Sequence, residues 1–339
     1  MATERQDVRD GAREAAEAAL WAPSVHNTQP WTFGLSGPRI TLRADADRRL
    51  GAADPDGREM LISCGAALLT LRVAALALGY DPDVRVLPDP DRPHLIADVV
   101  LGGRAEDRAR DEDARRLYGA VRERRTHRGP FRAAEIRPAL PPLLKLEAER
   151  EGAWLEQAVE PHTSAALGAL TQAAAHVQRM NPAYVAEEAR WAPPPGSTRP
   201  EGVHEEAYPE RPPRAGFAPR EFARGHDWGT ADTAGTADTA GDEPETGLVM
   251  LVTTPGDTPY DRVRAGQALQ RVLLRAHAED GLAAAFHTQP LEVPELREFV
   301  RTRFCGGRYP QALFRLGAPA GFEPAGVRRP AEAVIREEP

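Results

Sequence analysis

The segment from Arg58 to Leu78, REMLISCGAALLTLRVAALAL, is hydrophobic on nearly all sides. A helix with this pattern has no face that suits water, so other elements of the protein have to surround it. Gly79 follows directly and suits the C′ position that ends a helix. Nowhere do roughly 18 apolar residues run together, as a membrane-spanning helix requires. The sequence therefore predicts a helix buried in the middle of the fold.

A similar order of elements returns near the C-terminus. Val263–Asp280 reads as a second helix, and Gly281 closes it as Gly79 closes the first. With Gly65 aligned to Gly266, an offset of 201 residues and one inserted residue, three apolar positions match: Ala67 with Ala268, Leu68 with Leu269, and Leu71 with Val272. A period this long indicates two copies of one domain rather than a solenoid. Chance similarity of two apolar helices is the alternative.

The remaining pattern indicates an α+β fold. Residues 7–21 have helical periodicity, and Pro23 disfavours helical backbone in the residue before it, so this helix should stop at Trp21–Ala22. Residues 114–121 also read as helical. Strands are predicted at 31–35, 40–44, 83–88, 94–103, 247–255, 282–288 and 310–317.

Composition limits the kinds of partner. The chain has 339 residues, a net charge of −8 and a pI near 5.7, so it offers no broad positive field for nucleic acid or an anionic membrane. The first 20 residues lack the apolar core of a signal peptide. Cys64 and Cys305 lie far apart without CxxC spacing, which disfavours a disulfide framework and a zinc site. We expect a cytoplasmic globular protein with buried cysteines and no metal, nucleic acid or membrane partner.

The loop Ala22–Trp31, APSVHNTQPW, concentrates polar side chains between two prolines. These side chains belong to Ser24, His26, Asn27 and Gln29. Because binding residues are often carried on loops, this density of hydrogen-bonding groups favours a ligand-binding segment. A general-base role for His26 is the less favoured interpretation, and Trp31 is expected to anchor the loop in the core.

Arginines gather in two further places. RERRTHRGPF, Arg122–Phe131, follows a predicted helix and turns at Gly129–Pro130, and the pair Arg328–Arg329 precedes a proline near the C-terminus. Arginine binds phosphate bidentately, so the first cluster suits a phosphate clamp. The alternative is a solvated basic helix end that complements the helix dipole. The second pair is either a surface pair or part of a tail that returns to the phosphate site.

Residues 182–246 differ in character from the rest of the chain. They are rich in proline, contain Trp191 and Trp228, and include the small-residue repeat GTADTAGTADTAG at 229–241. The repeat indicates a flexible linker or loop tip. A loop of this length in a compact chain is usually a lid, a binding loop or disorder. The two tryptophans either pack a lid down or simply cover core.

These motifs in this order, APSxxNxQPW, RRTxRxPF, a helix closed by Gly-Leu and a final RRP, resemble the FMN-dependent nitroreductase superfamily. Over about residues 10–335, except the small-residue repeat, the chain is similar to its Acg-type branch, in which two nitroreductase-like halves are fused. The resemblance implies a nitroreductase-like α+β fold, internally duplicated as a single-chain pseudo-dimer, with a central antiparallel or mixed sheet in each half flanked by helices. The halves would be 1–104 and 105–339, the second including the possible lid or insert at 182–246.

The resemblance also implies an FMN site between the halves. The arginines would hold the phosphate, Arg128 would lie toward the N1/C2=O edge of the flavin, and the backbone N–H of Gly281 or Leu282 would meet N5. The polar loop would contact the ring and ribityl chain. The implied cofactor-binding residues are Ser24, His26, Asn27, Gln29, Arg124, Arg125, Thr126, Arg128, Gly281, Leu282, Arg328 and Arg329. Since each half supplies only part of this set, one site per chain is implied.

The implied activity is FMN-dependent reduction of a small organic molecule by NAD(P)H, or flavin-dependent dehydrogenation. Hydride would pass through flavin N5 without a catalytic side chain. Two other interpretations stay open: a protein that sequesters FMN under a lid with little turnover, and a degenerate fold that binds no flavin. A monomeric pseudo-dimer and a homodimer are both compatible with the resemblance.

Overall fold

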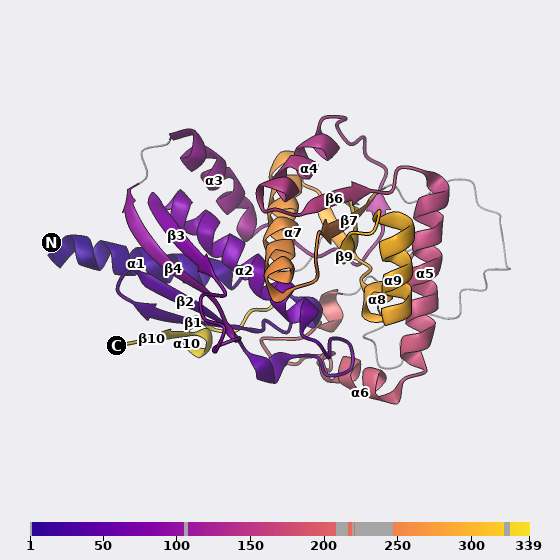
Figure 1. The fold of residues 1–339 in the computed structure, drawn as a ribbon, viewed down its shortest axis with the longest axis horizontal. Helices are drawn as coiled ribbons and strands as arrows, with labels where there is room; N and C mark the ends of the chain where they lie inside the picture. The colour runs from indigo at the N-terminus through magenta and orange to yellow at the C-terminus, as the bar shows by residue number, and fades with distance from the viewer. Residues whose placement is uncertain (1, 105–107, 208–215, 219, 221–246, 322–325) are drawn as a thin grey trace.

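The computed structural model describes residues 2–104, 108–207, 216–218, 220, 247–321 and 326–339 (Figure 1). Trp228 and the repeat at 229–241 lie outside the described residues. The helices are α1 (Ala2–Ala19), α2 (Arg58–Ala77), α3 (Arg108–Val121), α4 (Leu140–Arg150), α5 (Pro161–Arg179), α6 (Pro182–Arg190), α7 (Pro259–Asp280), α8 (Gln289–Glu292), α9 (Pro294–Phe304) and α10 (Ala331–Val334). The strands are β1 (Trp31–Ser36), β2 (Arg39–Ala44), β3 (Tyr80–Val86), β4 (Leu95–Arg104), β5 (Phe131–Arg132), β6 (Trp154–Gln157), β7 (Leu248–Thr254), β8 (Ala283–Phe286), β9 (Tyr309–Pro319) and β10 (Ile335–Glu337). The predicted α+β class is confirmed.

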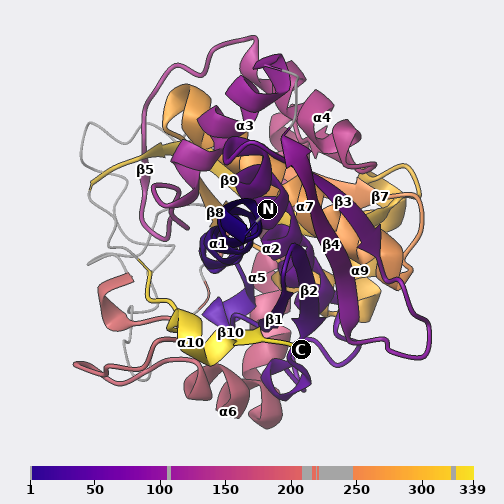
Figure 2. The same cartoon turned by 90° about the vertical axis from the view of Figure 1, so that its left-hand side faces the viewer.

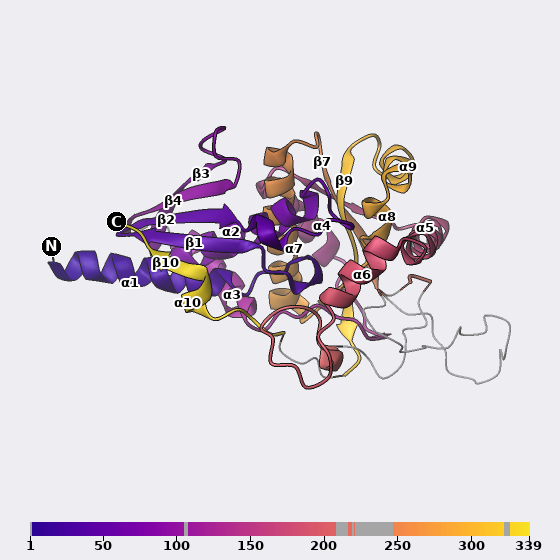
Figure 3. The same ribbon diagram turned by 90° about the horizontal axis from the view of Figure 1, so that it is seen from below.

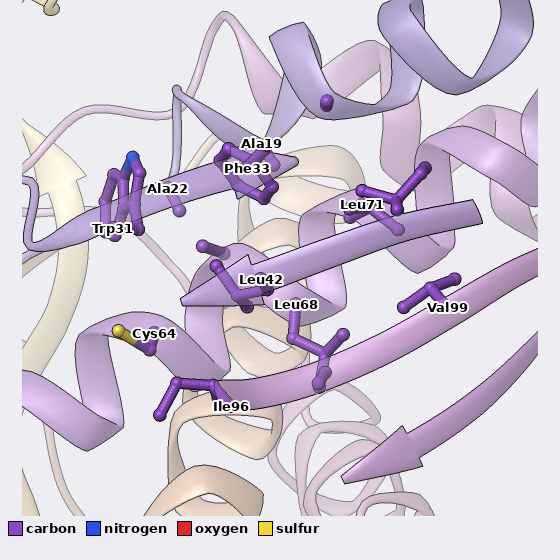
Figure 4. Packing of buried hydrophobic residues seen from close by; sticks show 14 of the residues in the cluster. Ala19, Ala22, Trp31, Phe33, Leu42, Cys64, Leu68, Leu71, Ile96 and Val99 are labelled. Atoms are coloured by element: carbon purple, nitrogen blue, oxygen red, sulfur yellow. The ribbon is translucent and has the colours of Figure 1, made fainter. Parts of the chain in front are cut away.

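The first sheet has the strand order β10-β1-β2-β4-β3. β10 is parallel to β1, whereas the other neighbours are antiparallel, so the sheet is mixed. α1 and α2 pack on it, and the buried side chains between them include Phe33, Leu68 and Ile96 (Figure 4). Trp31 is fully buried in the same cluster. Its predicted role as a core anchor is confirmed.

The second sheet has the order β5-β9-β7-β6, and β8 also pairs with β9. All of its pairs are antiparallel. Successive residues of a strand face opposite sides of the sheet. Phe314 of β9 therefore packs into the cluster beneath α4 and α7, and Leu313 packs into the one beneath α5 and α9. Burial on both faces explains why β7 and β9 are apolar nearly throughout.

One order of elements occurs twice in the chain. The first set runs α1-β1-β2-α2-β3-β4, with sheet neighbours β1-β2-β4-β3; the second runs α4-β6-β7-α7-β8-β9, with sheet neighbours β6-β7-β9-β8. The second set carries additional helices, α5 and α6 between β6 and β7, and α8 and α9 between β8 and β9. The two sets therefore match in connectivity and strand order apart from these insertions.

α2 and α7 pack against each other between the two sheets (Figures 1 and 3). They approach closely at Gly65 and Gly266, which the sequence comparison aligns. A Cβ added to Gly65 would lie 2.1 Å from the carbonyl oxygen of Val263, and one added to Gly266 would lie 1.9 Å from that of Ile62. Neither position has room for a side chain, so glycine allows the two backbones to meet.

The predicted central position of the segment at 58–78 is confirmed. Among the described residues α2 is the one helix long and apolar enough to cross a membrane, yet 83% of its apolar window is buried inside the protein. Gly79 has a φ of +90°, as expected for a glycine that ends a helix. The apolar surface of α2 is thus covered by the first sheet, α1, α3 and α7.

Two local interpretations differ from the structure. Residues 182–190 are not loop but helix α6, because the Asn181 side chain accepts from two backbone N–H groups of its first turn. α7 begins before Val263 because Thr258 and Asp261 form a capping box.

The C-terminal tail crosses back to the first half of the chain. β10 lies beside β1, with Phe33 opposite Ile335 and Leu35 opposite Glu337 (Figure 2). The residues 105–339 therefore supply one strand of the first sheet. On the way to that strand, the tail passes the loop at Ala22–Trp31.

Candidate functional site

The backbone of the loop at Ala22–Trp31 is strained. His26, Asn27 and Gln29 have φ values of 48°, 52° and 50°, in the left-handed region. Asparagine visits this region more readily than most residues, whereas each other side chain there costs about 1–3 kcal/mol. Such strain persists only where surrounding contacts hold it, and it is concentrated at functional sites.

Hydroxyl groups hold the loop from two sides. The N–H of Gln29 donates to Ser24 Oγ at 3.0 Å, and the N–H of Val25 donates to Ser63 Oγ of α2 at 3.3 Å. Ser24, predicted to contact a ligand, thus closes the turn of its own loop. Ser63 was not predicted, since it lies inside an apolar helix.

The insert lies directly on this loop. Asn27 Nδ2 donates to the carbonyl oxygen of Gly202 at 3.0 Å, and Gln29 Nε2 donates to that of Pro200 at 2.8 Å. Trp191, at the end of α6, is buried with Leu50 of the loop after β2. This part of 182–246 therefore packs on the predicted binding segment, and Trp191 covers a small core there.

The C-terminal arginines reach the same loop from the tail. Arg328 Nη1 lies 3.4 Å from Asn27 Oδ1, and its guanidinium stacks 5.2 Å from the ring centroid of Trp21. The backbone N–H of Arg329 donates to Gln29 Oε1 at 2.8 Å. The pair is therefore not a solvated surface pair, because the tail reaches the polar loop; its contact with a phosphate stays a prediction. The amide nitrogen and the amide oxygen of Gln29 therefore both form hydrogen bonds with groups of the chain itself.

The arginine-rich segment lies along β8. Thr126 forms a β-bridge with Ala284, and the N–H of His127 donates to the Ala284 carbonyl at 2.8 Å. Since Gly281 and Leu282 immediately precede β8, the structure places them beside this segment. Their N–H groups donate to the carbonyls of His277 and Ala276 at the end of α7. The predicted contact of either with flavin N5 stays a prediction.

Arg124, Arg125 and Arg328 form a cationic cluster in which Arg124 is buried and the other two are partly exposed. Arg124 is 4% exposed, and burial together with Arg125 lowers its pKa to about 10. Burial, Arg124 and Arg125 lower the pKa of Arg328 to about 9. In the described part of the chain, Nε and Nη1 of Arg124 and Nε of Arg328 are buried without a hydrogen-bond partner. Buried guanidinium donors without acceptors fit an anion such as a phosphate.

His26 contacts Arg220 of the insert. It is 5% exposed, and burial, Arg220 and Arg128 lower its pKa well below the usual value. Its Nε2 lies 3.2 Å from Arg220 Nη1. Burial and the charges of Arg220 and Arg128 therefore favour the neutral form of the His26 imidazole. Arg220 was not predicted, since it stands alone in the insert without a motif around it.

The structure thus gathers the predicted residues from four parts of the chain. Contacts or electrostatic coupling join the loop to the tail, the tail to the arginine segment, and that segment to the residues after α7. A strained polar loop that the tail joins to a cationic cluster is an arrangement that suits an anionic ligand. The individual ligand contacts stay predictions.

Proteins of Mycobacterium tuberculosis (strain ATCC 25618 / H37Rv) are similar to this chain along most of its length. It is 34% identical to "Putative NAD(P)H nitroreductase Rv3131" over 316 residues, and this alignment covers 92% of this chain and 86% of that protein. It is 28% identical over 339 residues to "Putative NAD(P)H nitroreductase acg", covering 96% and 95%. It is 29% identical over 334 residues to "Uncharacterized protein Rv3127", covering 96% and 92%. No family model matches the chain. The chain belongs to the nitroreductase superfamily, and the resemblance seen in its motifs is confirmed.

Proposed function

We propose that this protein is an FMN-dependent oxidoreductase that takes electrons from NAD(P)H and reduces a small organic acceptor such as a nitroaromatic or a quinone. The cationic cluster of Arg124, Arg125 and Arg328 carries the proposal, because the buried donors of Arg124 and Arg328 that lack an acceptor among the described residues suit the FMN phosphate. The names of two relatives support NAD(P)H as the donor. FMN would supply the hydride chemistry at its N5 atom.

The chain's own residues would bind and orient the cofactor. Arg124, Arg125 and Thr126, with Arg328 and Arg329, would hold the phosphate. Arg128 would place a positive charge near the N1/C2=O edge, where it would stabilise negative charge on the reduced ring. The loop residues Ser24, His26, Asn27 and Gln29 would form the opposite wall, and Gly281–Leu282 would lie near N5.

We further propose that the fold is an internally duplicated pseudo-dimer with halves at 1–104 and 105–339. The repeated strand orders and the meeting of Gly65 with Gly266 across α2 and α7 support it. The polar loop occurs only in the first half and the arginine segment only in the second. A single chain would therefore form one complete FMN site, whether or not two chains associate.

The test is flavin binding by the purified protein and its variants. The proposed function predicts flavin absorbance after purification, or its appearance when FMN is added, and bleaching under anaerobic NADPH or NADH. Arg125→Ala should weaken FMN binding by about 1.5–3 kcal/mol, the loss expected for a hydrogen bond to a charged group. Arg115→Ala, on the exposed face of α3, is the matched control and should bind FMN like the unmodified chain. Absence of flavin under both conditions would refute the proposal.

A second candidate function is FMN sequestration with little turnover. It is favoured by the hydrogen bonds that tie Pro200 and Gly202 of the insert to the polar loop, since an insert fixed there restricts access. The two functions separate in one experiment. Rapid bleaching of bound flavin by NADPH or NADH supports the enzyme, whereas bleaching only after deletion of residues 182–228 supports storage.

A further inference from the structure

Arg220 is the centre of a buried hydrogen-bond network. Its Nη1 lies 3.2 Å from His26 Nε2 and 2.7 Å from the Tyr184 hydroxyl, and its Nη2 lies 2.7 Å from Thr288 Oγ1. Both nitrogens also contact the Glu292 carboxylate. The side chains of Arg220 and Glu292 are 10% and 1% exposed. Partners from the polar loop, α6 and α8 therefore fix one guanidinium group.

This geometry determines the protonation of His26. A guanidinium group only donates hydrogen bonds, so the His26 Nε2 that faces it has to carry a lone pair. The single ring proton then lies on Nδ1, and the imidazole is neutral. The charged groups that act on His26 are Arg220 from the insert and Arg128 from the arginine segment, and both oppose its protonation. Glu292 and Glu59 act on Arg220 in turn.

We propose that Arg220 is a positioning residue that holds His26 as a neutral imidazole with its proton on Nδ1. This inference rests on the proposed function, in which His26 belongs to the wall of the flavin site. A neutral His26 keeps a second cation away from Arg128, whose charge is the one aimed at the ring edge.

Imidazole NMR of the full chain tests the inference without flavin. The chain has nine histidines, and loss of one signal in His26→Gln assigns the resonance. In the unmodified chain we expect the Nδ1–H tautomer and no titration between about pH 6 and 8. Arg220→Met removes the donor and leaves the buried Glu292 without its cation. The pKa of His26 should then rise from its value in the unmodified chain, because Arg220 no longer opposes its protonation, while burial and Arg128 still lower it.

Two further variants and a control keep the inference testable if Arg220→Met folds poorly. Arg220→Lys keeps a cation, and the double variant Arg220→Met/Glu292→Gln removes both charges, so His26 should stay neutral in each. Arg199→Met removes another arginine of the insert, one that bonds to the Arg190 carbonyl instead, and should leave His26 unchanged. An Nε2–H tautomer in the unmodified chain, unaltered titration in Arg220→Met, or an equal shift in Arg199→Met would overturn the inference.

Flavin reduction supplies the functional readout. In the FMN-loaded protein the rate of flavin reduction by NAD(P)H should be flat between about pH 6 and 8. In Arg220→Met it should acquire a pH dependence with the midpoint that NMR gives for His26. A protein that binds no flavin refutes the proposed function, while the NMR result still decides the role of Arg220. A flat profile in Arg220→Met, despite a titrating His26, would show that His26 protonation has no effect on the site.

Discussion

Alanine in place of Gly65 or Gly266 should destabilise the protein at the contact between its two halves. The added Cβ would lie 2.1 Å or 1.9 Å from a carbonyl oxygen, whereas ordinary contact begins at 3.4 Å. The helices would have to separate by about 1.5 Å, the larger of the two differences. Overpacking of this kind costs about 1–3 kcal/mol. Since the opposing atom is backbone and cannot rotate away, we expect the upper end of that range.

The higher helix propensity of alanine partly offsets this loss of stability. Alanine is about 1 kcal/mol more favourable than glycine inside a helix, so the expected net loss is about 2 kcal/mol. Gly119→Ala isolates this gain, because Gly119 lies in α3 and a Cβ there would meet nothing within 4 Å. The control should therefore gain up to about 1 kcal/mol.

Urea unfolding followed by the fluorescence of the five tryptophans measures all of these variants. A lower midpoint with an unchanged m-value reports lost stability. One separation of α2 from α7 relieves both clashes, so Gly65→Ala/Gly266→Ala should lose less than the sum of the single losses. The reasoning fails if Gly65→Ala is as stable as Gly119→Ala.

Three further predictions concern the charged groups and the cofactor. Arg124→Met should raise the free energy of unfolding of the flavin-free protein at pH 7 by roughly 1–3 kcal/mol and should weaken FMN binding, because the pKa of Arg124 is lowered from 12.5 to about 10 and its charge therefore opposes folding at every pH below about 10. Chemical unfolding measures the first effect and an FMN titration the second, and a loss of stability would contradict the prediction. Asp257→Asn should lower the free energy of unfolding by roughly 1–3 kcal/mol at pH 7. Burial raises the pKa of Asp257, but hydrogen bonds from Arg297, Gln311 and Arg262 outweigh burial and lower it, so the stabilisation is present above about pH 3.8 and is lost as the pH falls. Urea unfolding should therefore show a smaller difference in stability between the variant and the unmodified chain at pH 3 than at pH 7. FMN titration followed by fluorescence should saturate at one flavin per chain, and two would contradict the proposed division of the site.

Regular periodicity made much of the fold predictable. The apolar run of α2, the glycines that close α2 and α7, and the strands that follow each helix all appear where hydrophobic pattern and turn residues indicate them. Elements stabilised by tertiary contact were missed. β10 is three residues long and pairs with β1 about 300 positions away, so no local signal could reveal it.

The candidate site was predictable where several functional groups stand together in the sequence. Dense motifs such as APSVHNTQPW and RRTHR stand out, and the structure brings them close together. Isolated residues do not stand out. Arg220 and Ser63 act on the loop from the insert and from α2, and neither has a neighbouring residue that marks its role. The roles of Ser24 and Gln29 within the chain depend on the strained turn, which sequence pattern does not show.

The equivalent place in the second half explains why a second site is not expected. Under the proposed duplication, the 201-residue offset matches Ser63 of α2 with Arg264 of α7. Ser63 Oγ accepts a hydrogen bond from Val25 of the long polar loop. Arg264 Nε instead donates to the carbonyl of Glu151, in the short turn between α4 and β6.

The Arg264 side chain packs on the turn between α4 and β6, which corresponds in element order to the loop Ala22–Trp31 of the first half. A Cβ added to Gly152 would lie 1.9 Å from Arg264 Nη2, so the guanidinium packs directly on the turn. Glu151 is buried and forms salt bridges with Arg72 at 2.6 Å and Arg271 at 2.7 Å. Arg72 and Arg271 thus have a carboxylate partner, whereas Nε and Nη1 of Arg124 have no hydrogen-bond partner among the described residues. The arginines beside the turn between α4 and β6 are thus neutralised by Glu151, whereas Arg124 keeps buried donors without acceptors, and only the latter arrangement suits a phosphate.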